Sequence, residues 1–479
     1  MILKEFDNKN ILILGLAREG IDTLNFLFKL YPKRSFGVSD RLPLDNLNVN
    51  ARKLIKKYQN RLTLFLGDDY LRSINKYDVI IKSPGIPLII IARFLKPKHT
   101  ITSQMKIFFD HCPGKIIGIT GTKGKSTTTC LIYTILKEGG IHAHILGNIG
   151  KPVLSSLLTT TPNDVYVCEL SCHQLSDMKR SPHIAVFLNI FPEHLDYYGT
   201  YEEYQNAKVN ICQYQGKEDY LIYNPANLIV KRLIKNSSAI KIPINPQNVN
   251  KFMKLPDLTV GVSSPALRRE QNPAEAENLL RVHPRRGINK RDIPLKGDFN
   301  LLNIDAAIKV GELYGISQTI IKKAIKEFKP LHHRLEFVGK YKGINFYNDS
   351  LATVPEATIS AIDVFDPKID TLITGGFDRG VSYNTLAKRI VNSHIKNIAF
   401  LPTTGKIIWD QICKLNHKHR RINVLFTSSM KEAVLFSYRN TKTNRICLMS
   451  CASASFNLFK DYQARGNTFK NYVKKITTS

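Results

Sequence analysis

The chain contains no run of apolar residues long enough to cross a membrane. Its first apolar stretch, ILILGLA at residues 11–17, falls well short of the roughly 20 residues that a membrane-spanning helix needs. It also follows acidic and polar residues rather than the basic start of a secretory signal. No CxxC pair occurs among the eight cysteines, so the usual spacing of zinc knuckles is absent. We therefore expect a cytosolic protein in which the two CxxxC pairs, Cys168/Cys172 and Cys447/Cys451, are buried reduced thiols.

Acidic residues are scarce relative to basic ones. The chain has 39 Asp and Glu against 69 Lys and Arg, which gives a formal net charge of +30. Such a balance attracts polyanions, but the basic residues are spread from end to end and no nucleic-acid-binding motif accompanies them. We expect no specific nucleic-acid partner, and a polyanion-binding protein with a phosphate loop is the non-enzymatic alternative. The densest basic segment, residues 266–292, is predicted to be a solvated surface insertion.

Strand-like and helix-like segments alternate almost throughout, which is typical of α/β proteins with parallel sheets. At roughly 150 residues per domain, 479 residues suggest about three domains. We predict a Rossmann-like N-terminal domain at residues 1–112, a central parallel sheet of the P-loop ATPase type at 113–329, and a Rossmann-like C-terminal domain at 330–479. The first βαβ unit has Gly15 and Gly20 but no complete GxGxxG, so a dinucleotide is not its expected ligand.

A phosphate-binding loop is predicted in the segment GKIIGITGTKGKSTTTC, residues 114–130. An apolar strand leads into a turn of glycine and lysine and then into a helix, so backbone N–H groups can point at a phosphate. The strict GxxxxGK[ST] spacing is missed by one residue, because Gly118 precedes Gly124 by six positions. We expect this loop to bind ATP through Gly121, Thr122, Lys123, Gly124, Lys125, Ser126 and Thr127, with Ser126 also able to ligate Mg²⁺.

Three further side chains follow the loop at positions suited to metal-assisted phosphate chemistry. Glu169 ends a predicted strand, where a carboxylate can hold Mg²⁺. His194 follows another predicted strand, and Lys208 lies on the next predicted helix. Taken singly, His194 would be an ordinary loop histidine and Lys208 a solvated helix lysine. Their order after a phosphate loop makes the combination specific.

The series of motifs resembles the Mur ligase superfamily over nearly the whole chain. One such motif would be weak evidence, but their order along the chain is specific. The motifs are GTKGKST (121–127), GNIG (147–150), ELSCHQL (169–175), NIFPEHLDYYG with AK (189–208), GDFNLLNIDAA (297–307), HHRLE (332–336), YNDSLAT (347–353), GGFDRG (375–380) and SFNLFKDYQARGNTF (455–469).

Within the superfamily, the chain is most similar to ligases that add glutamate to UDP-N-acetylmuramoyl-L-alanine. The resemblance implies an ATP-dependent amide ligase of cytoplasmic peptidoglycan precursor synthesis that works through an acyl phosphate. It implies ATP and Mg²⁺ as cofactors, UDP-N-acetylmuramoyl-L-alanine and glutamate as partners, no membrane insertion and a monomer. D-Glutamate is the expected amino acid. The alternatives are L-glutamate and another amino acid added by a neighbouring ligase of the superfamily.

The resemblance also implies roles for individual residues. Lys125, Glu169, His194 and Lys208 match catalytic positions. Ser126, Glu169, His194 and Lys208 match metal-binding positions, with Lys208 carbamylated. Further ATP contacts match Asn300, Asn303, Arg334 and Asp349. The UDP-sugar contacts match Leu16, Ala17, Arg18, Asp40, Arg41, Ser83, Pro84, Gly85 and Asn148. The amino-acid contacts match His333, Thr353, Arg379, Ser455 and Tyr462.

Three residues depart from the commonest pattern of the glutamate-adding ligases. Arg379 stands where lysine is usual, Tyr462 where phenylalanine is usual, and Leu351 where lysine is frequent. Arginine and lysine are not interchangeable at a carboxylate site, because a planar fork and a point charge hold carboxylates differently. Glutamate is the expected substrate, and these departures leave its stereochemistry open.

Overall fold

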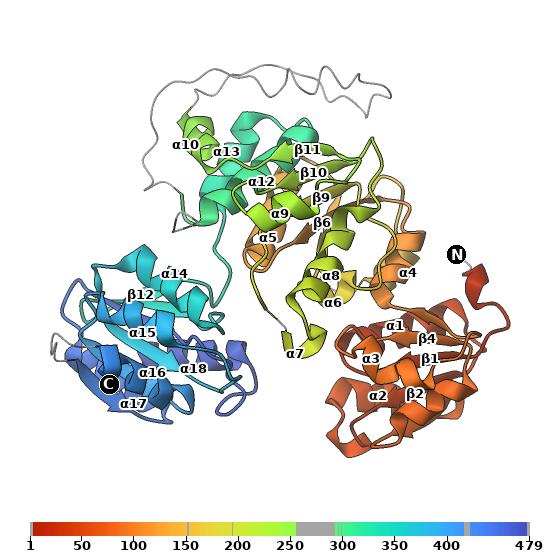
Figure 1. Cartoon of the computed structure of the whole chain (residues 1–479), viewed down its shortest axis with the longest axis horizontal. Coiled ribbons are helices and arrows are strands. Elements are labelled where there is room, and N and C mark those ends of the chain that lie inside the picture. The colour runs from red at the N-terminus through yellow and green to blue at the C-terminus, as the bar shows by residue number, and fades with distance from the viewer. Residues whose placement is uncertain are drawn as a thin grey trace. The chain divides into compact units, whose positions relative to one another are not determined.

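The computed structural model describes residues 3–150, 153–193, 195–254, 293–295, 297, 299–415 and 422–476. The chain divides into two compact units, Met1–Asp292 with Leu301–Glu327, and Ile293–Asn300 with Phe328–Ser479. Three sheets flanked by helices follow one another along the chain, two in the first unit and one in the second (Figure 1). The predicted α/β class with three domains is confirmed. The predicted basic insertion at 266–292 lies outside the described residues.

The first sheet is fully parallel, with strand order β3-β2-β1-β4-β5. Its central strand β1 is buried at every residue and apolar throughout, as expected for a parallel sheet covered on both faces. The strands are β1 (Ile11–Leu14), β2 (Phe36–Asp40), β3 (Leu62–Leu66), β4 (Val79–Lys82) and β5 (Thr100–Thr102). The helices are α1 (Arg18–Leu30), α2 (Val49–Lys57), α3 (Leu88–Ile91) and α4 (Gln104–His111), with short 3-10 turns η1 (Lys4–Phe6), η2 (Leu44–Asn46), η3 (Gln59–Arg61), η4 (Tyr70–Lys76) and η5 (Ala92–Phe94).

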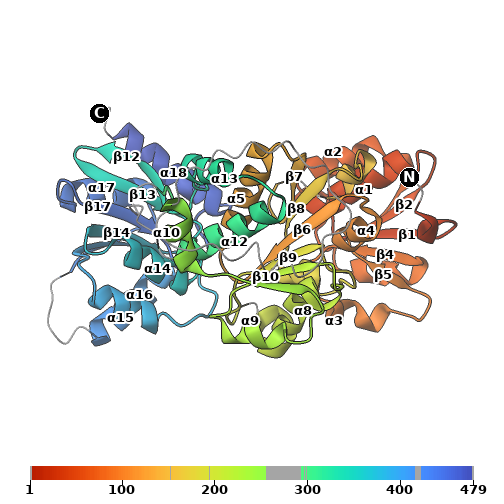
Figure 2. The ribbon, with the colours of Figure 1, turned by 90° about the horizontal axis from the view of Figure 1, so that it is seen from above.

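The second sheet is also parallel, in the order β11-β10-β9-β6-β8-β7. Helix α5 packs on β6, β7 and β8 and against α13 (Figure 2). The strands are β6 (Lys115–Thr120), β7 (Ala143–Gly147), β8 (Val165–Glu169), β9 (Ile184–Phe187), β10 (Tyr220–Tyr223) and β11 (Ile240–Pro243). The helices are α5 (Lys125–Glu138), η6 (Leu154–Leu158), α6 (Cys172–Leu175), α7 (Leu195–Tyr198), α8 (Tyr201–Gln213), α9 (Leu228–Leu233), α10 (Pro246–Lys254), α12 (Phe299–Leu313) and α13 (Gln318–Glu327).

The first two sheets share one hydrophobic core. Its buried members run from Leu3 to Ala239, and the ring of Phe108 on α4 meets the ring of Tyr166 on β8 edge-on at 5.3 Å. A polar contact reinforces this join. The buried carboxylate of Asp22 on α1 accepts hydrogen bonds from the Gln104 side chain at 2.7 Å and from the backbone N–H of Leu154 at 3.1 Å. The first unit is therefore held together by apolar packing as well as by chain connectivity.

The third sheet is mixed, in the order β12-β13-β17-β14-β15-β16. Only β12 runs antiparallel, which corrects the expectation of purely parallel sheets. The reason is a tight hairpin at Lys342 and Gly343, both with positive φ, as a two-residue turn requires. The strands are β12 (Glu336–Tyr341), β13 (Ile344–Asp349), β14 (Ile369–Gly375), β15 (Asn397–Leu401), β16 (Asn423–Phe426) and β17 (Ile446–Ser450). The helices are α14 (Pro355–Phe365), α15 (Asn384–Val391), α16 (Thr404–Leu415), α17 (Met430–Asn440) and α18 (Tyr462–Lys475).

The four cysteines of the two CxxxC pairs are free and buried, as predicted. Cys413 is exposed, and Cys112 and Cys130 are half-buried. Among the described residues, none of the helices combines the length and the apolar character that crossing a bilayer requires.

Candidate active site

The turn between β6 and α5 has the geometry of a phosphate loop. Gly124 precedes the helix with φ +91°, and a Cβ there would lie 2.4 Å from the side-chain oxygen of Asn303. This position therefore requires glycine on both conformational and steric grounds. The ammonium of Lys125 folds back onto the loop and donates to the carbonyls of Gly121 at 2.9 Å and Thr122 at 3.1 Å. A cation beside a helix N-terminus is suited to binding phosphate oxygens.

A residue that the sequence reasoning did not select, Asn189, holds this loop in shape. Its side-chain oxygen accepts from the N–H of Lys123 at 2.8 Å, and its side-chain nitrogen donates to the Lys123 carbonyl at 2.9 Å. The backbone carbonyl of Asn189 also accepts from the N–H of Thr122 at 3.0 Å. Asn189 opens the motif NIFPEHLDYYG, but its contact with the loop spans 66 residues, so its local sequence gave no sign of this role.

Glu169 lies at the carboxyl end of β8 and is buried. One carboxylate oxygen accepts a hydrogen bond from the side chain of Asn148 at 2.9 Å, but the other, Oε2, is buried without a partner. A buried, unpartnered carboxylate oxygen carries a large desolvation cost unless a cation or donor meets it. A carboxylate oxygen that has no other partner therefore fits the role of a Mg²⁺ ligand.

Lys208 projects from α8 toward the phosphate loop. Its amine is buried and donates to the Gly121 carbonyl at 3.0 Å, and it lies 5.1 Å from the centre of the Tyr204 ring. Burial and, to a smaller extent, the charge of the neighbouring Lys125 together lower the pKa of Lys208 to about 7. Burial also lowers the pKa of Lys125. An amine that is largely neutral near physiological pH is a nucleophile, unlike an ordinary surface lysine.

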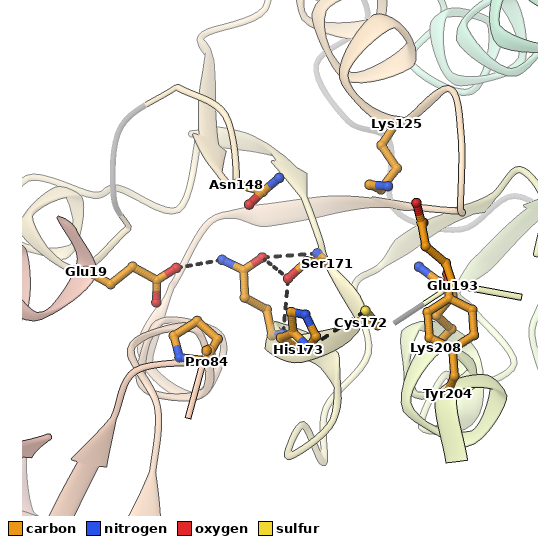
Figure 3. A pocket seen from close by; sticks show the side chains of 12 residues that line it. Glu19, Pro84, Lys125, Asn148, Ser171, Cys172, His173, Glu193, Tyr204 and Lys208 are labelled. Atoms are coloured by element: carbon orange, nitrogen blue, oxygen red, sulfur yellow. Dashed lines mark hydrogen bonds between the residues drawn. The ribbon is translucent and has the colours of Figure 1, made fainter. Parts of the chain in front are cut away.

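Lys125 and Lys208 both line a pocket of about 260 Å³ in the first unit (Figure 3). Lys125 and Lys208 lie on the same side of it as Glu193, and Asn148 projects from the loop after β7. The lining residues are Glu19, Pro84, Gly85, Lys125, Asn148, Ser171, Cys172, His173, Gln174, Glu193, Tyr204 and Lys208. Five of them were predicted as site residues from the sequence: Pro84, Gly85, Lys125, Asn148 and Lys208.

Several lining residues were not anticipated from the sequence. Gln174 sits in a capping box with Ser171, and its side-chain nitrogen donates to Glu19 on α1 at 2.8 Å. Burial raises the pKa of Glu19, and the hydrogen bond from Gln174 opposes that effect. The carboxylate of Glu193 pairs with the Lys123 ammonium at 3.0 Å. The contacts of Glu19 and Glu193 join distant segments, for which no local spacing gives a signal. The S-x-x-Q spacing of Ser171 and Gln174 is a local signal of a capping box.

The predicted UDP-sugar residues of the first sheet lie at the carboxyl ends of β1, β2 and β4. The backbone N–H of Leu16 donates to Asp40 at 2.6 Å, so this donor is already committed. Arg18 donates to the backbone carbonyls of Asn148 and Gly150 in the loop after β7. Ser83 donates to the Gly15 carbonyl at 3.0 Å. Ala17 directly precedes α1, and Arg41 is exposed.

Of the remaining predicted ATP residues, Asn303 on α12 contacts the phosphate-loop helix. Its side-chain oxygen accepts from the Thr128 hydroxyl at 3.1 Å. Thr127 has a buried hydroxyl without a partner, and Ser126 is half-buried. Asn300 is buried and belongs to the second unit. His194 lies outside the described residues, so its metal-binding and catalytic roles stay predictions.

In the second unit, the predicted residues gather at the carboxyl edge of the third sheet, where ligands of open α/β sheets bind. Asp349 ends β13, and its carboxylate accepts from the Leu335 N–H at 3.2 Å and the Ser450 hydroxyl at 2.7 Å. Burial raises the pKa of Asp349 to about 7. Arg334 directly precedes Leu335.

The predicted amino-acid contacts follow the same edge. Thr353 follows β13, and Arg379 follows β14, with its guanidinium carbon 5.5 Å from the centre of the Phe456 ring. Ser455 follows β17. Tyr462 begins α18, with its ring 6.0 Å from that of His333. His333 is buried and hydrogen-bonded to the side chain of Asn348 at 2.9 Å.

Arg465, a further residue that the sequence reasoning missed, organises this edge from within. It is fully buried, and its guanidinium donates to the Ser350 hydroxyl at 3.0 Å and carbonyl at 2.9 Å, and to the carbonyls of Ser453 and Ala454 at 3.0 and 3.2 Å. The same side chain thus links α18 to the loops after β13 and β17.

Comparisons with known proteins agree with this geometry. Residues 119–311 match the model of the Mur ligase middle domain. The chain is 31% identical to UDP-N-acetylmuramoylalanine--D-glutamate ligase of Acetivibrio thermocellus, over 99% of this chain and 98% of that protein. It is 32% identical to the protein of the same name from Clostridium kluyveri, over 98% and 97%.

Solved structures share the fold. The UDP-N-acetylmuramate-alanine ligase MurC of Thermotoga maritima has a TM-score of 0.56 at 16% identity, covering 98% of this chain and 100% of that chain. The MurF ligase of Thermotoga maritima, solved in complex with ADP, has a TM-score of 0.54 at 15% identity, covering 99% and 98%. Full-length identity above 30% to curated relatives establishes the family. The chain therefore belongs to the Mur ligase family of ATP-dependent peptidoglycan precursor ligases.

Proposed function

We propose that this enzyme joins D-glutamate to UDP-N-acetylmuramoyl-L-alanine in the cytoplasm, forming an amide through an acyl phosphate. The observation that carries the proposal is the convergence of Lys125 and Lys208 on the carbonyl of Gly121, in a pocket bounded by residues of both the first and second sheets. The curated relatives above carry the matching name and align over nearly their whole length.

In the first step, the carboxylate of the alanyl end attacks the γ-phosphorus of ATP, a P–O bond to the β-phosphate breaks, and ADP leaves. Both reactants are anions, so positive charge must neutralise them while the loop orients the phosphoryl group. Lys125 is placed to exchange its two carbonyl partners for phosphate oxygens. Asn189 keeps the loop fixed during this exchange because it holds Lys123 through two hydrogen bonds.

Mg²⁺ would be held by Ser126, Glu169 Oε2, His194 and a modified Lys208, and would neutralise the phosphate oxygens. The modification proposed is carbamylation: the neutral Lys208 amine forms an N–C bond with CO₂ and releases one proton, giving an anionic carbamate. The lowered pKa of Lys208 supports this, because only the neutral amine reacts. In a Lys208→Ala variant, a short carboxylate such as acetate should restore measurable turnover. The absence of any restoration would contradict the carbamate.

In the second step, the glutamate amine attacks the acyl carbon, a tetrahedral intermediate forms, and its collapse expels phosphate and leaves the amide. We assign the amino acid to the carboxyl edge of the third sheet, at Thr353, Arg379, Ser455 and Tyr462, with His333 alongside. Arg379 offers a planar fork for the side-chain carboxylate of glutamate. Arg334, Asp349, Asn300 and Asn303 are proposed to serve the nucleotide.

L-Glutamate is the second candidate, because Arg379, Leu351 and Tyr462 depart from the pattern usual for the D isomer. The deciding experiment measures phosphate release with MgATP and UDP-N-acetylmuramoyl-L-alanine, supplying D-glutamate and L-glutamate in parallel. Turnover with D-glutamate alone supports the proposal. A preference for L-glutamate transfers the assignment to the other isomer, and no turnover with either refutes the substrate assignment.

An Arg379→Lys variant tests the assignment of the amino-acid site. If Arg379 holds the side-chain carboxylate, this variant changes KM for glutamate and leaves KM for ATP nearly unchanged. An equal change in both constants would contradict the assignment, because it would indicate a general structural effect.

A further inference from the structure

The second sheet carries a cluster of metal-ligating side chains at the edge opposite the active site. His142 directly precedes β7, His144 is its second residue, and Asp164 directly precedes β8. The two strands are parallel neighbours, with Ala143 opposite Val165. Residues two apart in a strand point to the same face, so the two imidazoles meet the carboxylate together.

The three side chains already converge on a single point. The Oδ1 atom of Asp164 lies 2.5 Å from His142 Nδ1 and 2.8 Å from His144 Nε2. The three ligand atoms all lie within 4.8 Å of one another. Around a tetrahedral ion with bonds of about 2.0 Å, ligand atoms stand roughly 3.3 Å apart. To reach that spacing from Asp164 Oδ1, the ligand nitrogen of His142 shifts by about 0.8 Å and that of His144 by about 0.5 Å. The side chain of His142 is 75% exposed and has room for this movement.

Neighbouring residues fix the orientation of the side chains in this cluster. The other carboxylate oxygen of Asp164 accepts from the backbone N–H of Thr161 at 2.6 Å and from its hydroxyl at 2.8 Å, which fixes the orientation of the carboxylate. The ring of His144 stacks on Tyr166 at 5.0 Å with an interplanar angle of 17°. Burial opposes ionisation of Asp164, but the hydrogen bonds from His144, Thr161 and His142 outweigh it and hold its pKa below the usual range.

We propose that His142, His144 and Asp164 form a binding site for a borderline divalent transition-metal ion such as Zn²⁺. Two imidazole nitrogens and one carboxylate oxygen are the ligands that such ions prefer, and Mg²⁺ prefers oxygen-only sets. Each imidazole binds the ion through the nitrogen that faces Asp164, and the proton on that nitrogen is released to solvent or, by exchange with water, taken up by the other ring nitrogen. Because His142 is exposed, water completes the coordination.

The place of the site indicates a structural role. β7 is an edge strand of the second sheet, and the ion links the first residues of β7 to those of β8. The same two strands end at Asn148 and Glu169, which are hydrogen-bonded to each other in the active site. Zn²⁺ binding should therefore raise the melting temperature of the first unit without taking part in ligation.

The test is calorimetric titration of Zn²⁺ into full-length, chelator-dialysed protein without nucleotide or Mg²⁺. We expect one site that is absent for Mg²⁺ and weakened at least tenfold by His142→Ala, since even outer-shell changes cost about 10–100-fold in affinity. His183→Ala is the matched control, because His183 pairs with a single carboxylate, Asp219, at 2.8 Å. Equal affinity in wild type and His142→Ala, or no Zn²⁺ binding by the wild type, would overturn the proposal.

The absorption spectrum of bound Co²⁺ distinguishes binding at this site from binding at cysteines. Co²⁺ bound by imidazole and carboxylate shows only weak visible bands, whereas thiolate ligation adds strong near-ultraviolet charge-transfer absorption. We expect no thiolate band, and an unchanged spectrum when the exposed Cys413 is replaced in Cys413→Ser. A thiolate band on the first equivalent of Co²⁺ would assign the ion to cysteine and refute the proposal.

Discussion

Replacing the buried Lys208 by methionine should make the protein more stable and inactive. Burial holds the pKa of this amine at about 7, against an ordinary 10.5. At pH 8 the unfolded chain therefore binds the proton and the folded chain does not, which costs the folded state about 3 kcal/mol. Methionine has similar length and no charge, so Lys208→Met removes this cost.

Part of the gain is lost with the hydrogen bond from Lys208 to Gly121, which contributes about 1 kcal/mol. The Gly121 carbonyl keeps its second donor, Lys125, so no buried acceptor is orphaned. The expected net gain is about 2 kcal/mol at pH 8. Because the folded pKa is lowered, wild-type stability rises with pH between about 7 and 10.5. The advantage of the variant should fall by about 1.4 kcal/mol per pH unit over that range.

The assay is scanning calorimetry of the first unit in bicarbonate-free buffer from pH 6 to pH 10, together with phosphate release. The single tryptophan, Trp409 on α16, belongs to the second unit and reports its unfolding separately. The exposed Lys231→Met is the control and should change stability by less than about 0.5 kcal/mol. A Lys208→Met protein that is less stable than wild type at every pH would refute the reasoning.

Three further changes test other parts of the molecule. Glu169→Gln should lower phosphate release about 10²–10³-fold, because a positioned charge is lost; a loss under tenfold would contradict its role at the unpartnered oxygen. Arg465→Lys should cost the second unit about 3 kcal/mol through at least two lost charge-assisted hydrogen bonds, measured by Trp409 fluorescence in urea. A cost under about 1 kcal/mol would show that these bonds contribute little. In the wild type, the raised pKa of Asp349 means that the unfolded state releases this proton first, so the free energy of unfolding declines as the pH rises from about 4 to about 7. Asp349→Asn should lack this decline. Identical pH profiles of Asp349→Asn and wild type in urea unfolding would exclude that contribution.

Local patterns predicted the phosphate loop because its determinants are local. The apolar strand, the glycines and Lys125 lie within one short segment, and the backbone follows from their order. The central strands were predictable for the same reason, since strands buried on both faces are continuous apolar runs. Strands β3, β5, β7, β11 and β16 were not predicted from the sequence. Each of them is only partly buried and includes a polar residue, so its apolar pattern is interrupted.

Contacts between distant segments could not be predicted from spacing. Asn189 meets Lys123 across 66 residues, and Arg465 meets Ser350 across 115. In both cases the side chain is ordinary in its local sequence and acquires its role only when the sheet brings two loops together. The hairpin that makes β12 antiparallel is different, because Lys342-Gly343 between two strands is a recognisable turn signal that was overlooked.

The core shared by the first two sheets has a consequence for dissecting the molecule. A fragment ending near residue 112 would expose Phe108 and leave Asp22 without its partner Leu154. Such a fragment should aggregate rather than fold, even though its sheet is topologically complete. Heating the intact chain should give two calorimetric transitions rather than three. One would melt the first two sheets cooperatively, and the other, which alone changes Trp409 emission, would melt the third.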